Sequence, residues 1–310
     1  MKRYLFFNDK NIYKANLHCH TIFSDGKCFP KEIKELYKSK GYSIVAFTDH
    51  CILKPQFHLN DEEFLAINAC EMDITQNPPD MPWEKKKTYH LNLYAVNQEM
   101  VKTPPLPRIE YENINEINNY IKERASEGFL VCYNHPYWSL QNYVDYTKLE
   151  GCFAMEIYNH GCEVEGLYGY NPQSYDEMLR NGNKLFCLST DDNHNHEPED
   201  SFGWDSFGGF VMISSADLKY ENIMKSLIKG DFYSSQGPII HEISIENNKL
   251  YIRCSEVDLI VVYTDGRRCY IKSGNSINEA EFELKGDDNY IRIMCRDKEK
   301  KDANSNAFWL

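Results

Sequence analysis

The fold is decided by residues 16–26, which read Asn16-Leu17-His18-Cys19-His20-Thr21-Ile22-Phe23-Ser24-Asp25-Gly26. An apolar segment runs into a His-x-His pair, and a carboxylate follows one short loop later. On an extended backbone, the spacing of His18 and His20 points both imidazoles to the same side. Two imidazoles with a nearby aspartate form a first set of ligands for a divalent cation. A His-x-His pair alone is weak support, so the metal hypothesis depends on matching ligands elsewhere in the chain.

The composition indicates a folded, acidic protein. The chain has 310 residues, of which 42% are hydrophobic, and its 22 Tyr and 16 Phe are enough to fill a large core. The formal net charge is −13. Because a protein that follows a phosphate backbone needs a basic face, this charge disfavours extended nucleic-acid binding. A small phosphorylated substrate remains compatible with it, since bound cations would supply positive charge locally.

The cysteines and the apolar segments bear on the location of the protein. The 11 cysteines are scattered singly without a Cys-x-x-Cys pair, so we expect reduced thiols that pack as small hydrophobic residues, not a finger-type zinc site. The beginning of the chain lacks a signal-peptide pattern, and no segment is long and apolar enough to cross a membrane. These features favour a cytoplasmic protein without a membrane partner.

Two predicted strands bring a third histidine beside the first pair. Residues 14–19 are typical of a strand that ends at His20, and residues 30–37 have the apolar spacing of a helix that stops at Gly41. Residues 43–47 form a short β-branched run, typical of a buried strand, and His50 follows it. A βαβ unit of this kind places His50 at the same strand end as His20.

The next two predicted strands break the parallel pattern. Residues 65–70 predict a strand that ends at Glu71, whereas His90 stands at the beginning of the following strand, residues 89–96. If these two strands pair antiparallel, Glu71 and His90 come together across the pair.

The rest of the first 230 or so residues returns to strand and helix alternation. Strands are predicted over residues 129–133, 153–158, 184–189 and 209–213, and helices over residues 111–127, 174–180 and 217–229. His135 follows the first of these strands, and Asp192 and His194 follow the third. The alternation predicts an α/β fold, a distorted β/α barrel of the TIM-like type, over residues 1–232.

The pattern changes after Gly230. Residues 238–310 show short alternating runs at 241–246, 250–254, 259–263, 281–284 and 290–296, separated by turn residues and without a helical period. This pattern predicts a small all-β, sandwich-like domain appended to the barrel, with residues 234–238 as the junction.

The chemistry-bearing residues gather at predicted strand ends: His18, His20, His50, His135, Asp192 and His194. In a β/α barrel these ends converge on one face, where such enzymes build their sites. One histidine at a strand end is more often a hydrogen-bonded core or surface residue. Six ligand-type residues placed in this way favour a metal site.

Four motifs, in this order along the chain, resemble those of the PHP (polymerase and histidinol phosphatase) family: His18-x-His20 with Ser24-Asp25-Gly26, Thr48-Asp49-His50, Asn134-His135-Pro136 and Asp191-Asp192-Asn193-His194. The resemblance covers about residues 10–230, and it implies a distorted β/α barrel with two or three divalent metal ions at the strand ends. The appended β domain is similar to that of a subset of PHP hydrolases, some of which are associated with carbamate or amide substrates.

The resemblance also implies which residues bind each ion. The ligands of the first ion would be His18, His20, Glu71 and Asp192. Those of the second would be Glu71, as a bridge, with His90 and His135, and those of the third would be Asp25, His50 and His194. Zinc, manganese and iron all suit these ligands.

The function implied is that of a metal-dependent hydrolase. The leading hypothesis is a phosphoesterase in which a metal-bridged hydroxide attacks a small phosphorylated substrate or a nucleotide end. The leaving group would be protonated by Asp192 or His194, if either leaves its metal, or by a water. The alternative is a hydrolase of a carbamate, amide or ester at the same site. A non-enzymatic binding module is disfavoured because a degenerate site should have lost ligands. A pocket arginine or lysine facing the third ion would favour phosphate, and an apolar rim would favour the alternative.

Five further residues have weaker assignments. Tyr137 and Trp138, directly after His135, would wall the pocket or pack elsewhere, and Lys87 would meet a phosphate or belong to a solvated run of charge. Asp49 would orient a histidine or cap a turn, and Glu156 would support either the site or the fold.

Overall fold

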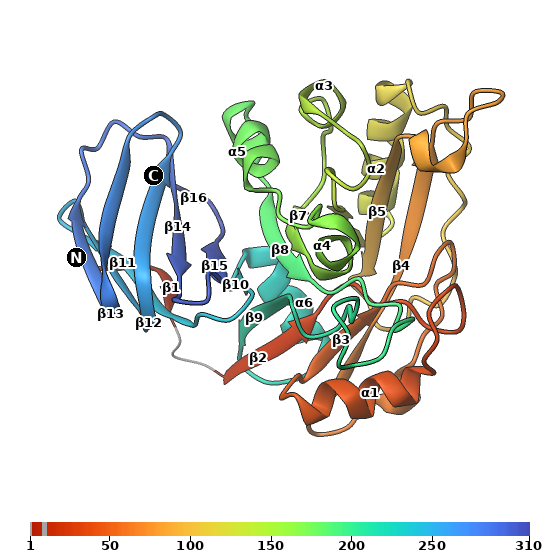
Figure 1. Cartoon of the computed structure of the whole chain (residues 1–310), viewed down its shortest axis with the longest axis horizontal. Helices are drawn as coiled ribbons and strands as arrows, with labels where there is room; N and C mark the ends of the chain where they lie inside the picture. Colours follow the sequence, from red (N-terminus) through yellow and green to blue (C-terminus); the bar gives the residue numbers. More distant parts are fainter. Residues whose placement is uncertain (1, 8–10) are drawn as a thin grey trace.

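The structure is a computed structural model, which describes residues 2–7 and 11–310 (Figure 1). The strands of the described residues are β1 (Arg3–Phe7), β2 (Asn11–Asn16), β3 (Ile44–Phe47), β4 (Leu65–Thr75), β5 (Thr88–Ala95), β6 (Phe129–Tyr133), β7 (Ala154–Asn159), β8 (Phe186–Thr190), β9 (Phe210–Ser215), β10 (Phe232–Ser235), β11 (Ile240–Glu246), β12 (Lys249–Thr264), β13 (Cys269–Glu283), β14 (Tyr290–Arg296), β15 (Asp302–Ser305) and β16 (Phe308–Trp309). The α-helices are α1 (Pro30–Ser39), α2 (Ile114–Ser126), α3 (Tyr143–Tyr146), α4 (His160–Gly166), α5 (Pro172–Arg180) and α6 (Tyr220–Lys229), and two 3-10 turns cover Phe57–Leu59 and Trp83–Lys85.

The α/β part of the molecule begins at β2. β2, β3 and β4 are parallel, with α1 connecting the first two, so the predicted βαβ unit is confirmed. α1 begins at Pro30 and buries Ile33 and Tyr37 along one side. β5 is antiparallel to both β4 and β6, and β6, β7 and β8 are again parallel. The predicted break in the parallel order therefore lies where it was expected.

A closed barrel is not confirmed. The hydrogen-bonded strand order is open, running β1-β11-β12-β14-β15-β10-β9-β2-β3-β4-β5-β6-β7-β8. β2 pairs with β9 on one side and β3 on the other, and within the described residues β8 pairs with β7 alone. Beyond their ends, the extensions of β2 and β8 do meet. There Asp192 N donates to His18 O over 2.9 Å, and His20 N donates to Asn193 O over 3.0 Å.

β4 is longer than predicted. We expected a strand over residues 65–70 that ends at Glu71, but β4 continues to Thr75, which pairs with Thr88 of β5. Met72 and Ile74 are buried, and the polar Asp73 and Thr75 alternate with them. This short alternation is typical of a strand with one buried face, and the glutamate within it obscured its continuity.

Only strands follow α6 in the described chain. β11 to β16 form a second layer beside the α/β part, and the C-terminus lies in that layer (Figure 1). β10, which overlaps the beginning of the predicted junction, pairs with both β9 and β15, so one sheet continues through the whole molecule. β1 also joins this layer by pairing with β11, which the sequence pattern did not indicate. The boundaries 1–232 and 238–310 stay a prediction.

The two longest strands were predicted as shorter pieces. The runs at 250–254 and 259–263 belong to the single strand β12, and β13 begins at Cys269, twelve residues before the predicted run at 281. Most of β13 is exposed, so it lacks the apolar alternation that identifies a strand in a sequence. In the part of the chain that the structure describes, no helix has the length and apolarity needed to cross a membrane.

Candidate metal centre

His18 and His20 follow β2 and are completely buried. His18 Nδ1 lies 2.7 Å from Glu156 Oε1, and with a proton on Nδ1 in this hydrogen bond, Nε2 would be the atom that binds an ion. The Nε2 atom lies 3.1 Å from His20 Nε2, 3.0 Å from Asp192 Oδ1 and 3.3 Å from Glu71 Oε1. Four acceptor-type side chains therefore face one point.

The spacing of these atoms fits a cation. Ligand atoms that bind one zinc-like ion at about 2.0–2.2 Å in a tetrahedron are about 3.3–3.6 Å apart, and the separations here are 3.0–3.4 Å. Asp192 Oδ1 is buried and makes no hydrogen bond, although two imidazole nitrogens lie within 3.1 Å of it. Buried lone pairs that face one another are unfavourable unless a positive charge lies between them. The donor set therefore suits a divalent ion.

The protonation states of Glu71, Asp192 and His20 are those of metal ligands, whereas an ion would have to displace a proton from His18. Burial would lower the pKa of His18, but Asp192 and Glu71 raise it well above its usual range. Burial would raise the pKa of Glu71, but the surrounding histidines, His90 first, hold it well below its usual range. Burial would likewise raise the pKa of Asp192, and His18 holds it well below its usual range. Burial and the neighbouring His194 lower the pKa of His20 to about 3. Ionised carboxylates and a neutral imidazole are the forms that coordinate metals.

Glu71 stands at the middle of the cluster. Its Oε1 lies 3.1 Å from His90 Nδ1 and accepts a hydrogen bond from Asn134 Nδ2 over 2.8 Å, while its Oε2 lies 3.1 Å from His50 Nδ1. The predicted meeting of Glu71 and His90 across an antiparallel pair is thus observed. The residue directly opposite His90 in the register is Asp73, and Glu71 reaches the ring from two positions away.

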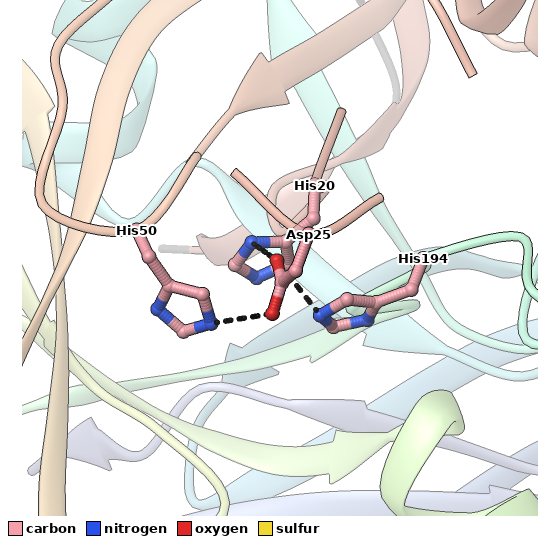
Figure 2. A group of neighbouring side chains, drawn as sticks. All are labelled: His20, Asp25, His50 and His194. Atoms are coloured by element: carbon pink, nitrogen blue, oxygen red, sulfur yellow. Dashed lines mark ion pairs between the residues drawn. The ribbon is translucent and has the colours of Figure 1, made fainter. Parts of the chain in front are cut away.

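Asp25 is at the centre of a second group of side chains (Figure 2), which is more exposed than the group around His18. Its carboxylate lies between the rings of His20, His50 and His194, each with a nitrogen 3.5 Å from a carboxylate oxygen. About half of the Asp25 side chain is exposed, and more than a quarter of each of the His50 and His194 side chains is exposed. These groups are therefore the part of the cluster that a bound molecule reaches most easily.

Two of the clustered residues have unusual backbone conformations. His135 has a φ of 24° and Asp192 has a φ of 52°. Positive φ costs a residue with a Cβ about 1–3 kcal/mol and concentrates at functional sites. The conformation turns the His135 ring toward the cluster, with Nε2 3.5 Å from Glu71 Oε1 and 3.7 Å from Asp192 Oδ2.

The cluster opens into a cavity of about 810 Å³. Its lining includes seven of the nine predicted ligands: Asp25, His50, Glu71, His90, His135, Asp192 and His194. The other two, His18 and His20, are buried beneath it. The structure thus brings the nine residues together, and their roles as ligands stay a prediction.

The three residues predicted to touch substrate lie in different places. Trp138 lines the cavity, its ring 5.1 Å from that of His135, and its Nε1 donates to Glu165 Oε2 over 2.5 Å. Tyr137 is 55% exposed and lies outside the cavity lining, and Lys87 forms an ion pair of 2.7 Å with Asp145, also outside it.

Glu156 and Asp49 support the cluster in different ways. Glu156 is completely buried on β7, and its two oxygens accept from four donors: His18 Nδ1, Thr190 Oγ1, His135 N and Asn159 Nδ2. Asp49 Oδ1 accepts from Thr21 N over 2.8 Å and from Ser24 Oγ over 2.9 Å. Asp49 therefore holds the loop that carries Asp25, and it does not contact a ligand histidine.

The sequence pattern missed several cavity residues. Trp83, Cys162, Glu165 and Glu197 line the cavity without belonging to any motif. Cys162 and Glu165 lie on α4, a helix too short to be recognised from its apolar spacing. No lysine or arginine is among the described residues that line the cavity. The side chain that would favour a phosphate substrate, an arginine or lysine facing the third ion, is therefore absent from this lining.

The fold and the cluster together define a mixed α/β protein with a candidate divalent-metal centre. The family model described as "PHP domain" matches residues 16–227. The chain belongs to the PHP domain family, as its ordered motifs predicted. A comparison with curated proteins gave no match.

One solved structure shares the fold over nearly the whole chain, and two others align more weakly. A two-domain protein from Bacteroides vulgatus that contains a predicted PHP-like metal-dependent phosphoesterase aligns with a TM-score of 0.52 and 13% identity, over 99% of this chain and 97% of that one. A protein from Bifidobacterium adolescentis, provisionally assigned as a metal-dependent phosphoesterase, aligns with a TM-score of 0.39 and 14% identity, over 62% and 92% of the two chains. An amidohydrolase from Chromobacterium violaceum, solved with sulfate and no metal, gives 0.35 and 12%, over 58% and 87%.

Proposed function

We propose that this protein is a metal-dependent phosphoesterase that acts on a small phosphorylated substrate or a nucleotide end. The observation that supports this most strongly is the donor set around His18, in which buried imidazole nitrogens and carboxylate oxygens face one another at 3.0–3.4 Å. Membership of the PHP domain family supports the same class of chemistry.

The proposed centre divides the nine residues among up to three ions of zinc, manganese or iron. The first ion is assigned to His18, His20, Glu71 and Asp192, the second to Glu71, His90 and His135, and the third to Asp25, His50 and His194. Divalent ions bound there lower the pKa of water and polarise a phosphoryl or acyl oxygen.

The chain's own residues orient the reaction. Glu156 fixes the ring of His18 and the backbone of His135, so both imidazoles keep their direction. The exposed edge of the cluster, at Asp25 and His50, receives the substrate oxygen. Of the two candidates for protonating the leaving group, each of which would first have to leave its ion, we favour His194, because 28% of its side chain is exposed against 11% for Asp192. Trp138 forms a wall that limits the entry of water.

A second candidate function is the hydrolysis of a carbamate, amide or ester. It is favoured by the acidic lining, where Asp73, Glu165 and Glu197 accompany the cluster and no lysine or arginine does so among the described residues. A dianionic phosphate would then depend on bound cations alone for its positive charge.

The test is release of product by manganese-loaded protein from two panels, one of phosphomonoesters and nucleotides and the other of carbamates, amides and esters. The variants are His50→Ala, in the cluster, and His58→Ala, an exposed histidine outside it. We expect phosphate release by the parent and by His58→Ala, and at least a hundredfold less by His50→Ala. Turnover of the second panel alone, by protein with its metals bound, would replace the phosphoesterase proposal with the second candidate.

A further inference from the structure

We propose that Cys162 supplies a thiolate ligand to the ion held by His135, so that the centre contains a soft ligand beyond the nine predicted residues. The proposal rests on the proposed metal centre. A ring nitrogen of His135, the Sγ of Cys162 and a carboxylate oxygen of Asp192 lie within 4.8 Å of one another. Nitrogen, oxygen and sulfur atoms bound to one zinc-like ion are about 3.3–3.7 Å apart, so a shift of about 1 Å brings all three into contact with it.

One side chain, Asn159, fixes Cys162 relative to Asp192. The Asn159 Oδ1 accepts a hydrogen bond from Cys162 N over 2.9 Å, at the beginning of α4. Its Nδ2 donates to Asp192 Oδ2 over 3.0 Å and to Glu156 Oε2 over 2.8 Å. The backbone of Cys162 and the Asp192 carboxylate are therefore held by the same amide, which also caps the beginning of α4.

A glycine allows α4 to come this close. A Cβ at Gly161 would lie 2.9 Å from the carbonyl oxygen of Asp192 and 3.2 Å from that of Asp191. Gly161 N donates to Asp191 O over 2.8 Å, so the beginning of α4 is attached to the loop that carries the carboxylate. A residue with a side chain here would push Cys162 away from the cluster.

Three of the buried thiols in the described chain have a hydrogen-bond partner of a kind that Cys162 and the buried Cys70 lack. The Sγ atoms of Cys19, Cys132 and Cys187 each donate to a backbone carbonyl oxygen. Within the described residues, Cys162 Sγ makes no hydrogen bond, although only 3% of the residue is exposed. Asp192 Oδ1, also buried, is without a hydrogen bond as well. Asp192 Oδ1 faces His18 and His20, whereas Asp192 Oδ2 lies 3.7 Å from His135 Nε2 and is the oxygen nearer to the proposed ion at His135.

Cys162 differs from the other ten cysteines by its place in the molecule. Among the described residues it is the cysteine that lines the cavity and the one that falls within a group of metal-ligand atoms. Binding of the ion displaces the thiol proton to solvent and forms the metal–sulfur bond, with no change of oxidation state. Because thiolate is a soft ligand, it favours zinc over manganese at this position.

The direct test is X-ray absorption spectroscopy of the full-length protein loaded with one, two and three equivalents of zinc. We expect a sulfur scatterer at about 2.3 Å from zinc, amounting to one sulfur per protein. Cys162→Ser and Cys162→Ala should lose it, and zinc affinity relative to manganese should fall at least about tenfold in both. Cys295→Ser, which changes a buried cysteine on β14, should keep the sulfur signal and the affinity ratio.

The outcomes separate the two proposals. Zinc bound with nitrogen and oxygen neighbours only, at every loading, would overturn the assignment of Cys162 and leave the metal centre standing. Failure of folded protein to bind zinc at all would overturn the metal centre, and with it this inference. The spectrum of the unsubstituted protein decides the question even where a variant does not fold.

Discussion

At the scale of single residues, Glu156 orients two of the proposed metal ligands. Its carboxylate accepts from the ring of His18 over 2.7 Å and from the backbone of His135 over 3.0 Å. Thr190 Oγ1 and Asn159 Nδ2 occupy its remaining positions at 2.6 and 2.8 Å. All four partners are hydrogen-bond donors, so both terminal atoms of the side chain at position 156 must be acceptors to satisfy them.

Glu156→Gln should therefore weaken metal binding while leaving the fold in place. The amide group turns one acceptor into a donor that faces another donor, which lowers the free energy of unfolding by about 1–3 kcal/mol. Misorientation of His18 and His135 should lower zinc affinity about 10–100-fold. Competition with a chelator measures the affinity and urea unfolding measures the stability. Unchanged zinc affinity would show that Glu156 does not orient these ligands.

At the scale of elements, α4 decides how close Cys162 and Glu165 come to the cluster. Gly161→Ala should lower the free energy of unfolding by about 1–3 kcal/mol, because the new Cβ meets the Asp192 carbonyl oxygen at 2.9 Å. It should also weaken zinc binding. Gly266→Ala is the matched control, since its Cβ would have no neighbour closer than 3.9 Å. Urea unfolding measures the stability of both variants, and competition with a chelator measures their zinc affinity. Equal stability and equal zinc affinity of the two variants would contradict a role for close packing at Gly161.

The sequence predicted the strands correctly where a candidate metal ligand follows the end of the strand. His20, His50 and His135 each follow a buried apolar run, and the parallel order of strands then fixes which edge they share. Prediction failed for α4, because seven residues are too few to show a helical spacing of apolar residues. The approach of α4 to Asp192 depends on contacts of Gly161 and Asn159 with residues distant in sequence. Prediction also failed for β13 because exposed polar residues form most of that strand.

On the scale of the whole molecule, one open sheet links the α/β part to the C-terminal strands. The predicted distorted barrel is not confirmed, since within the described residues β8 pairs with β7 alone, and no local sequence pattern specifies a second partner for β8. A buried ion pair adds to the connection between the two parts. Arg292 of β14 is 1% exposed and bonds both carboxylate oxygens of Asp176 on α5, at 2.6 and 2.7 Å. The two residues of this ion pair are 116 positions apart in the chain, so the sequence pattern could not predict the pair.

The central claim is that nine residues scattered over this fold hold divalent ions in one place. Anomalous X-ray diffraction from crystals grown with manganese tests it most directly. The account predicts two or three anomalous peaks, each within about 2.0–2.4 Å of its assigned ligands, with one beside His18, His20 and Asp192. Well-ordered crystals with no anomalous peak among these side chains, at saturating manganese or zinc, would contradict it.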